Sequence, residues 1–223
     1  MTQTRTPIDF DKYEAIIFDL DGTLIDSMWL WGQIDIDYLG RFGLVSPPDL
    51  QACLAGMSVT ETALYIKDRF GITDPPEKMI SDWNDMAMDY YKHKIPLKKG
   101  ADAFLKAVRK RGFKTGIASS NSMELIDAVL DGLNIRPFFD SIHITNEVAK
   151  GKPSPDIYNL VAGELGVDNG KCLVFEDIKE GVMAGQAAGM EVCGVFDDFA
   201  DTKGGSIKDM AEYFINDFTE IVI

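Results

Sequence analysis

Short runs of β-forming residues alternate with helical patterns along much of the chain, and this alternation limits the possible folds more than any other feature. Strand-like runs are expected at residues 15–18, 114–118, 141–145, 172–175, 192–195 and 213–215. From residue 96 onward, helical patterns separate most of these runs. Strands joined through helices form a parallel sheet with helices on both faces. We therefore predict an α/β fold with a Rossmann-like parallel sheet.

The stretch from about residue 26 to residue 93 interrupts this alternation, because its patterns are helical throughout. Apolar residues recur at helical spacing in three stripes, which we interpret as the core of a helical bundle. The stripes are Trp31, Ile34, Tyr38 and Phe42; Val59, Ala63, Ile66 and Phe70; and Met79, Trp83, Met86 and Tyr90. We predict an α/β core over 1–24 and 96–223 and an inserted all-helical cap over 25–95, hinged near 24–27 and 94–97.

Capping residues mark the ends of several expected helices. Asn121 is a plausible N-cap for the helix that follows the strand at 114–118. Ser154 can cap and Pro155 can start a later helix, which Gly166 ends.

The formal charge is strongly negative, because 22 Lys and Arg against 36 Asp and Glu give 22 − 36 = −14. Such a chain repels nucleic acid and anionic membranes unless it carries a local basic patch. The basic cluster at 106–114 stands at the end of a helical pattern, where it complements the helix dipole. We expect neither nucleic acid nor a membrane as a partner.

The cysteines and the N-terminal segment bear on the cellular compartment. Cys53, Cys172 and Cys193 are far apart and form no CxxC pair, which is typical of a reducing compartment. Met1 to Pro7 is polar, and no apolar run approaches the roughly 18 residues of a membrane span. We expect a soluble cytoplasmic protein and, because a mobile cap needs no partner, a monomer.

Polar residues gather at the expected carboxyl ends of the strands, which is where ligands bind in parallel sheets. Each has an ordinary alternative as a turn aspartate, a helix cap, a solvated lysine or a polar loop. Carboxylates at two strand ends, with a hydroxyl and an ammonium in adjacent loops, nevertheless favour an active site. The set is Asp19 and Asp21 after the first strand, Ser119 after the second, Glu176 and Asp177 after the strand at 172–175, and Lys152 in a loop before a helix.

These residue types suit phosphoryl transfer. A carboxylate can attack phosphorus and form an aspartyl-phosphate. Mg²⁺ takes carboxylate and phosphate oxygens as ligands and offsets the repulsion between the carboxylate and an anionic ester. A lysine and a hydroxyl can hold the charge of the transferring group. A second carboxyl group can protonate the leaving oxygen and then activate water.

Four motifs, in order, make the chain resemble the haloacid dehalogenase-like hydrolase superfamily, in its β-phosphoglucomutase-like branch with a helical cap. The match runs from about residue 15 to residue 195, and Gly181 and residues 187–190 also fit the pattern. The motifs are Asp19-Leu20-Asp21-Gly22-Thr23, matching DxDGT; Ser119 at a strand end; Gly151-Lys152-Pro153-Ser154-Pro155-Asp156, matching GKPxPD; and Phe175-Glu176-Asp177.

The resemblance implies catalytic and phosphate-binding roles. Asp19 would be the nucleophile and Asp21 the general acid and base. Ser119 and Lys152 would bind the phosphoryl group, and Asn121 is a plausible further contact on the phosphate side.

The resemblance also implies a Mg²⁺ site. Asp19, the backbone carbonyl of Asp21, and Asp177 would bind the ion, with Glu176 as a further ligand or as a support beside it. The family often has serine after the acidic pair, and Ile178 removes that hydroxyl here. One hydrogen bond near the metal is therefore in doubt, but the metal itself is not.

Two departures bear on the reaction. Trp31 and Val59 stand where β-phosphoglucomutases carry a histidine and an arginine, which weakens the mutase interpretation. Dehalogenases and phosphonoacetaldehyde hydrolases of the superfamily lack the second aspartate, so Asp21 argues against both.

We therefore predict a Mg²⁺-dependent phosphatase that hydrolyses a small phosphorylated metabolite, a phosphate monoester, through an aspartyl-phosphate. The alternatives are a sugar-phosphate mutase and a non-catalytic phospholigand-binding protein. His93 and His143 have no metal-ligand partner in the sequence and are interpreted as surface or structural residues. Candidates that face the substrate from the cap, unless they pack the core of the cap instead, are Trp29, Trp31, Met57 and Val59.

Overall fold

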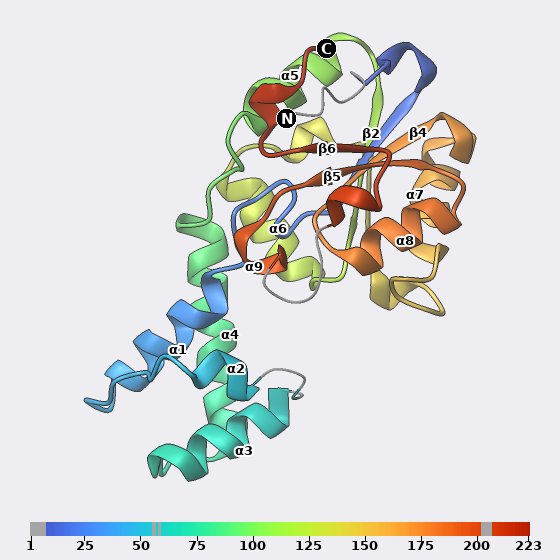
Figure 1. Cartoon of the computed structure of the whole chain (residues 1–223). Coiled ribbons are helices and arrows are strands. Elements are labelled where there is room, and N and C mark those ends of the chain that lie inside the picture. Colours follow the sequence, from blue (N-terminus) through green and yellow to red (C-terminus); the bar gives the residue numbers. More distant parts are fainter. Residues whose placement is uncertain (1–7, 55–56, 58, 202–206) are drawn as a thin grey trace. The chain divides into compact units, whose positions relative to one another are not determined.

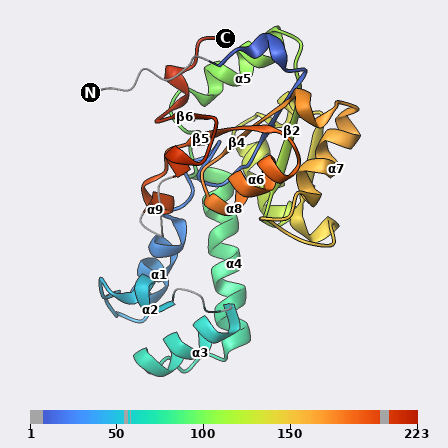
Figure 2. The same cartoon turned by 45° about the vertical axis from the view of Figure 1, so that its right-hand side comes forward.

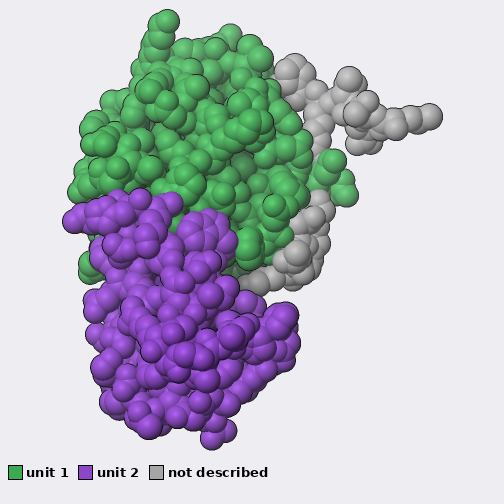
Figure 3. Space-filling view, turned by 90° about the vertical axis from the view of Figure 1, so that its left-hand side faces the viewer, with its two compact units in different colours: residues 1–28, 95–223 green, residues 29–94 purple. Residues whose placement is uncertain are grey.

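The chain divides into two compact units, Met1–Met28 with Ile95–Ile223, and Trp29–Lys94. The computed structural model describes residues 8–54, 57, 59–201 and 207–223 (Figure 1). Figure 3 marks the two units in different colours. The polar segment 1–7, for which we expect no secretion signal, lies outside the described residues.

The first unit, which we call the sheet unit, is built on a six-stranded sheet with the order β3-β2-β1-β4-β5-β6. All neighbouring strands pair in parallel, so the predicted parallel sheet is confirmed. The strands are β1 (Ala15–Phe18), β2 (Lys114–Ser119), β3 (Ser141–Ile144), β4 (Cys172–Glu176), β5 (Glu191–Val195) and β6 (Tyr213–Ile215).

Helices cover both faces of this sheet (Figures 1 and 2), which confirms the predicted fold class. The helices of the sheet unit are α5 (Ala101–Lys110), α6 (Met123–Gly132), α7 (Asp156–Leu165), α8 (Lys179–Ala187) and α9 (Asp198–Asp201). Short 3₁₀ helices lie at Phe10–Lys12, Arg136–Phe138, Thr145–Glu147, Asn169–Lys171, Ile207–Asp209 and Phe218–Glu220.

Alternation along β1 gives each face its own core, because successive strand side chains point to opposite faces. Ala15 and Ile17 belong to a buried cluster with residues of α7 and α8. On the other face, the ring of Phe18 stacks on Phe175 at 5.4 Å and meets the edge of Phe104 of α5 at 6.1 Å. The fully buried strand β1 therefore anchors both helical layers.

The chain turns tightly after β1. Gly22 has a φ of +81°, which favours glycine, and its N–H donates to the carbonyl of Ile25 over 3.0 Å. A Cβ at Gly22 would also overlap the carboxylate of Asp177. This turn therefore brings the segment after β1 against the end of β4.

The two linkers to the helical segment are hydrogen-bonded to each other. Ile25 and Leu97 form an antiparallel bridge, and the Asp26 N–H donates to the carbonyl of Pro96 over 2.9 Å. The Lys98 N–H donates to the carbonyl of Leu24, also over 2.9 Å. Residues 25–28 and 95–98 thus belong to the sheet unit.

The second unit, which we call the helical unit, consists of α1 (Leu30–Gly40), α2 (Leu50–Leu54), α3 (Val59–Phe70) and α4 (Pro76–His93). The centres of the three predicted stripes are buried, and the α4 stripe is buried along its whole length. The stripes end earlier than expected, since Trp31, Phe42 and Val59 are 50%, 40% and 52% exposed. Trp31 and Val59 lie in the first turns of α1 and α3, and Phe42 lies beyond the end of α1.

Two predicted helix starts are shifted by one residue. Ser122, and not Asn121, caps α6, because its hydroxyl accepts from the Leu125 N–H over 3.4 Å. Pro155 occupies the N-cap position of α7, where Ser154 was expected. Gly166 ends α7, as predicted, and adopts the left-handed conformation. Among the described residues, no helix is long and apolar enough to span a bilayer.

The packing of β2 against α7 generates a stability prediction. A Cβ at Gly116 would overlap Cγ1 of Val161, so Gly116→Ala should lower the free energy of unfolding by about 1–3 kcal/mol. Gly163 of α7 is the control, since a Cβ there meets no atom within 4 Å. Gly163→Ala should raise stability by roughly 0.5–1 kcal/mol. Urea denaturation measures both, and a Gly116→Ala protein as stable as the wild type would contradict this packing.

Candidate active site

Asp19 continues the chain directly beyond β1 and is held against β4. Its N–H donates to the carbonyl of Phe175 over 3.0 Å. Its side chain is buried and points to the carboxyl edge of the sheet, where Oδ1 accepts from Nζ of Lys152 over 2.5 Å. The site therefore starts at the end of a fully buried strand.

Lys152 reaches the same place from the loop before α7, and only 3% of its side chain is exposed. Nζ donates to Oδ1 of Asp19, to Oε1 of Glu176 over 2.6 Å and to the carbonyl of Ala118 over 3.0 Å. An ammonium has three protons, so these acceptors use all of them. The lysine is thereby fixed among the ends of β1, β2 and β4.

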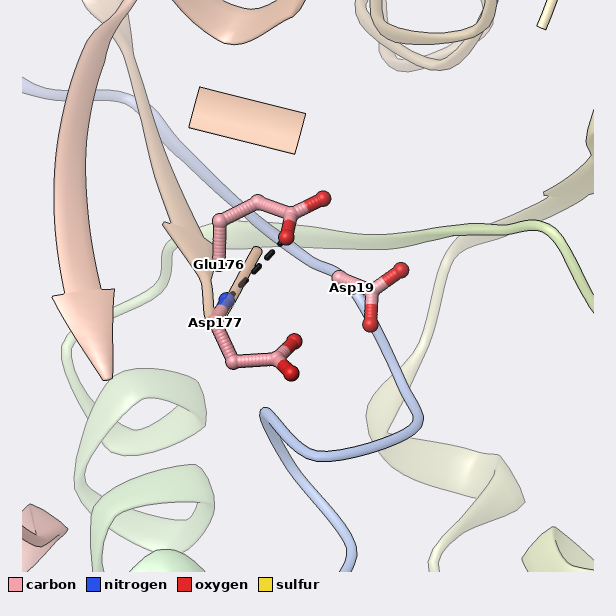
Figure 4. Close-up of side chains that lie close together, drawn as sticks. All are labelled: Asp19, Glu176 and Asp177. Atoms are coloured by element: carbon pink, nitrogen blue, oxygen red, sulfur yellow. Dashed lines mark hydrogen bonds between the residues drawn. The ribbon is translucent and has the colours of Figure 1, made fainter. Parts of the chain in front are cut away.

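The carboxylates of Asp19, Glu176 and Asp177 converge within 4.8 Å of one another (Figure 4). Oδ1 of Asp177 accepts from the Thr23 hydroxyl over 2.7 Å. Oδ2 of Asp177 is buried and has no hydrogen-bond partner in the described part of the chain. A buried carboxylate oxygen without a donor is expensive unless a cation satisfies it.

Burial and like charges set the electrostatics of this cluster. Burial raises the pKa of Asp19 to about 7, although the Lys152 ammonium opposes the shift. Burial, helped by the charges of Asp19 and Glu176, raises the pKa of Asp177 far above its ordinary range. Burial lowers the pKa of Lys152, but attraction by the two carboxylates outweighs it and the net pKa lies above the ordinary range.

The cluster has the composition of a divalent cation site. When all are ionised, three carboxylates face the single ammonium of Lys152, which leaves the charge that one divalent cation balances. Mg²⁺ prefers carboxylate oxygens, and Oδ2 of Asp177, which has no hydrogen-bond partner among the residues described, offers one. The residues present therefore fit such an ion.

Asp21 and its neighbours form the outer part of the site. Asp21 is half-buried, and its carboxylate accepts from the Ser27 hydroxyl over 2.7 Å and from Nδ2 of Asn121 over 2.9 Å. Ser119 is buried, and its Oγ accepts from the Asn121 N–H over 3.1 Å. Asn121 thus links the end of β2 to the turn after β1, which explains why it does not cap α6.

Several residues around the site were not singled out from the sequence. Thr23 belongs to the first motif, but no role was predicted for it. The Tyr158 hydroxyl donates to Oε1 of Glu176. Tyr158 lies in an apolar helix pattern, which gives no sign of such a polar contact. Asp197 follows β5 and pairs with Lys98 over 2.6 Å. An acidic residue just beyond a strand is the same signal that found Asp177, so Asp197 could have been found.

The four candidates for substrate contact belong to the helical unit, and His143 lies on β3. Trp29 packs edge-on against Tyr90 within the helical unit, whereas Trp31, Met57 and Val59 are exposed on that unit. The His143 ring contacts Glu147 and Glu164, which makes it part of an ion-pair cluster at the β3 edge.

Comparison with known proteins establishes the family. Residues 16–195 match the model of the haloacid dehalogenase-like hydrolase family. The chain belongs to this family, which confirms the resemblance found in the sequence. With the phosphatase names among its relatives, family membership also confirms the prediction of a phosphohydrolase enzyme.

The curated proteins to which the chain is similar include two whose names contain a phosphatase activity. One is a phosphorylated carbohydrates phosphatase of Thermotoga maritima, 29% identical over 191 residues, or 85% of this chain and 88% of the relative. The other is a bifunctional riboflavin kinase/FMN phosphatase of Arabidopsis thaliana, 31% identical over 182 residues. That match covers 81% of this chain but spans about half the relative, 48% of its length.

The chain is also similar to a solved structure. A Thermotoga maritima protein, provisionally assigned as a beta-phosphoglucomutase, superposes with a TM-score of 0.82 at 27% identity. The superposition covers 91% of this chain and 94% of that protein.

The buried bond between Thr23 and Asp177 generates a second stability prediction. Thr23→Val keeps the shape but removes the donor, so the free energy of unfolding should fall by about 1–3 kcal/mol. Thr219→Val is the matched control, because the Thr219 hydroxyl also donates to an aspartate, Asp217, but at an exposed position. Urea denaturation at neutral pH compares the two, and equal losses would show that the buried bond contributes no more than the exposed one.

Proposed function

We propose that the protein is a Mg²⁺-dependent phosphatase that hydrolyses a small phosphorylated metabolite through an aspartyl-phosphate on Asp19. One observation carries the proposal: Lys152 is fixed between Asp19 and Glu176, next to an Asp177 oxygen that lacks a hydrogen-bond partner among the described residues. This arrangement combines a nucleophile, a fixed positive charge and an open cation ligand. The name of the Thermotoga relative supports a phosphorylated carbohydrate as the substrate class.

The side chains suggest how the two chemical steps proceed. Asp19 attacks phosphorus, and the bond from phosphorus to the ester oxygen breaks. Asp21 donates a proton to the departing oxygen and then takes a proton from the water that hydrolyses the aspartyl-phosphate. Lys152, Ser119 and Asn121 hold the phosphoryl oxygens and stabilise their charge.

Asp19, Asp177 and the backbone carbonyl of Asp21 would hold Mg²⁺, with Glu176 either as a further ligand or as a support. When bound, the ion supplies charge that offsets the repulsion between the Asp19 carboxylate and the phosphate ester. Thr23 contributes by fixing one oxygen of Asp177, which leaves the other free to face the cation.

The helical unit would act as the cap that gives substrate specificity. It is inserted directly after the turn that carries Asp19 and Asp21. Lids of this kind exclude water and select substrates. The exposed side chains of Trp31, Met57 and Val59, together with Trp29, remain our candidates for the substrate-facing residues. A cytoplasmic, monomeric state remains part of the proposal.

Phosphate release from p-nitrophenyl phosphate tests the activity. We expect turnover with Mg²⁺ and none with EDTA, because the attacking carboxylate and the ester repel each other without the cation. Asp19→Asn should lower kcat by on the order of a thousandfold or more, since the nucleophile is lost. Asp102→Asn, which changes an exposed aspartate of α5, is the control. A wild-type rate in Asp19→Asn would show that Asp19 is not the nucleophile.

A sugar-phosphate mutase is the second candidate, favoured by the similarity to the provisionally assigned beta-phosphoglucomutase. Incubation with a β-hexose 1-phosphate separates the two functions. We expect free phosphate, because Trp31 and Val59 replace the residues that the mutase resemblance requires. Hexose 6-phosphate detected by NMR, in place of free phosphate, would overturn the phosphatase proposal.

A further inference from the structure

The carboxylate of Glu176 lies at the centre of a buried hydrogen-bond network. Oε1 accepts from Nζ of Lys152 over 2.6 Å and from the hydroxyl of Tyr158 over 2.7 Å. Oε2 accepts from the N–H groups of Asp177 and Ile178, over 3.0 and 3.3 Å. A carboxylate offers about four lone-pair positions, and these four donors occupy them. Glu176 therefore has no free position for a cation.

Helix α8 closes one side of this carboxylate. Glu176 is completely buried, and a Cβ at Gly181 would overlap both its carboxylate oxygens. The backbone of α8 thus lies directly against the carboxylate. Glu176 cannot turn in that direction.

Tyr158 contacts both members of the Lys152–Glu176 pair. It lies on α7 with no exposed surface, and Nζ of Lys152 is 5.3 Å from its ring centroid, within the range of a cation–π contact. Burial, together with the charge of Glu176, raises the pKa of Tyr158 well above 10, so the hydroxyl keeps the proton that it donates. Tyr158 thus contacts the lysine through its ring and the carboxylate through its hydroxyl.

We propose that Tyr158 is a positioning residue for the phosphoryl-binding lysine, because its hydroxyl holds Glu176 as the partner of Lys152 and away from the cation. This inference rests on the proposed function and deepens it. It resolves the two roles left open for Glu176 in favour of a support. The cation then depends on Asp19, Asp177 and a backbone carbonyl.

Removing the hydroxyl should loosen the lysine without disturbing the cation. In Tyr158→Phe, Oε1 of Glu176 keeps only Lys152 as a donor, and Glu176 gains freedom to turn. Lys152 would then hold a phosphoryl group less precisely. Asp177, which accepts from Thr23, keeps its position.

Three measurements on the full chain test this inference: steady-state kinetics with p-nitrophenyl phosphate, the inhibition constant of inorganic phosphate, and the Mg²⁺ dissociation constant by calorimetry. For Tyr158→Phe we expect kcat/KM to fall about tenfold, as for a lost hydrogen bond to a charged group. The phosphate inhibition constant should rise by a similar factor, and the Mg²⁺ dissociation constant should stay within about twofold of the wild-type value.

Tyr213→Phe is the matched control. The Tyr213 hydroxyl also donates to a glutamate, Glu191, over 2.9 Å, but at the start of β5, the opposite end of the strand from the site. All three constants should remain at wild-type values. If Tyr158→Phe unfolds at a markedly lower temperature than the wild type, the same comparison is made with Gly163→Ala added to every protein. That change should stabilise α7.

Two outcomes would overturn the inference. Tyr158→Phe could match Tyr213→Phe in all three constants, in which case Tyr158 only packs. Alternatively, Mg²⁺ affinity could fall together with phosphate affinity, in which case Glu176 acts at the cation. Failure of the proposed function is distinguishable from failure of this inference. If the wild-type protein hydrolyses no ester, its phosphate and Mg²⁺ binding can still be measured, with phosphate titrated directly by calorimetry.

Discussion

The buried ammonium of Lys152 is the charge around which the rest of the site is arranged. A buried ion without partners costs several kcal/mol, so its position is viable only where acceptors surround it. Asp19, Glu176 and the carbonyl of Ala118 supply them, and they stand at the ends of β1, β4 and β2. These are three adjacent interior strands of the sheet. The parallel register of the sheet therefore fixes the lysine, and the lysine in turn links three strand ends that carry polar groups.

Glu176 and Asp177 are adjacent in sequence but have opposite environments. Glu176 accepts from four donors, whereas one oxygen of Asp177 has no partner in the described residues. Successive residues at the end of a strand point to opposite sides, so one of the pair faces α8 and the other faces the turn that follows β1. Two carboxylates can thereby serve different purposes: one neutralises a lysine, and the other remains available to an ion.

Sequence reasoning found the sheet because alternating patterns extend over whole elements, and it found Asp19 and Asp177 because acids just beyond buried strands have few structural uses. The family match extends that reasoning to the whole of residues 16–195. It could not find Tyr158, since a tyrosine within an apolar helix face has the same pattern whether or not its hydroxyl makes a buried bond. It misplaced the cap of α6 at Asn121, because the side chain could not be known to reach Asp21. Local patterns specify elements, whereas such contacts depend on how distant segments meet.

The antiparallel bridge between Ile25 and Leu97 places the points where the chain leaves and re-enters the sheet unit side by side. A hairpin turn of a few residues can join antiparallel neighbours of this kind. The whole of Trp29–Lys94 could consequently be excised and the ends closed without altering the order of any strand. The architecture is modular at this junction: one sheet can accept inserts of different size while the edge that carries its carboxylates stays the same.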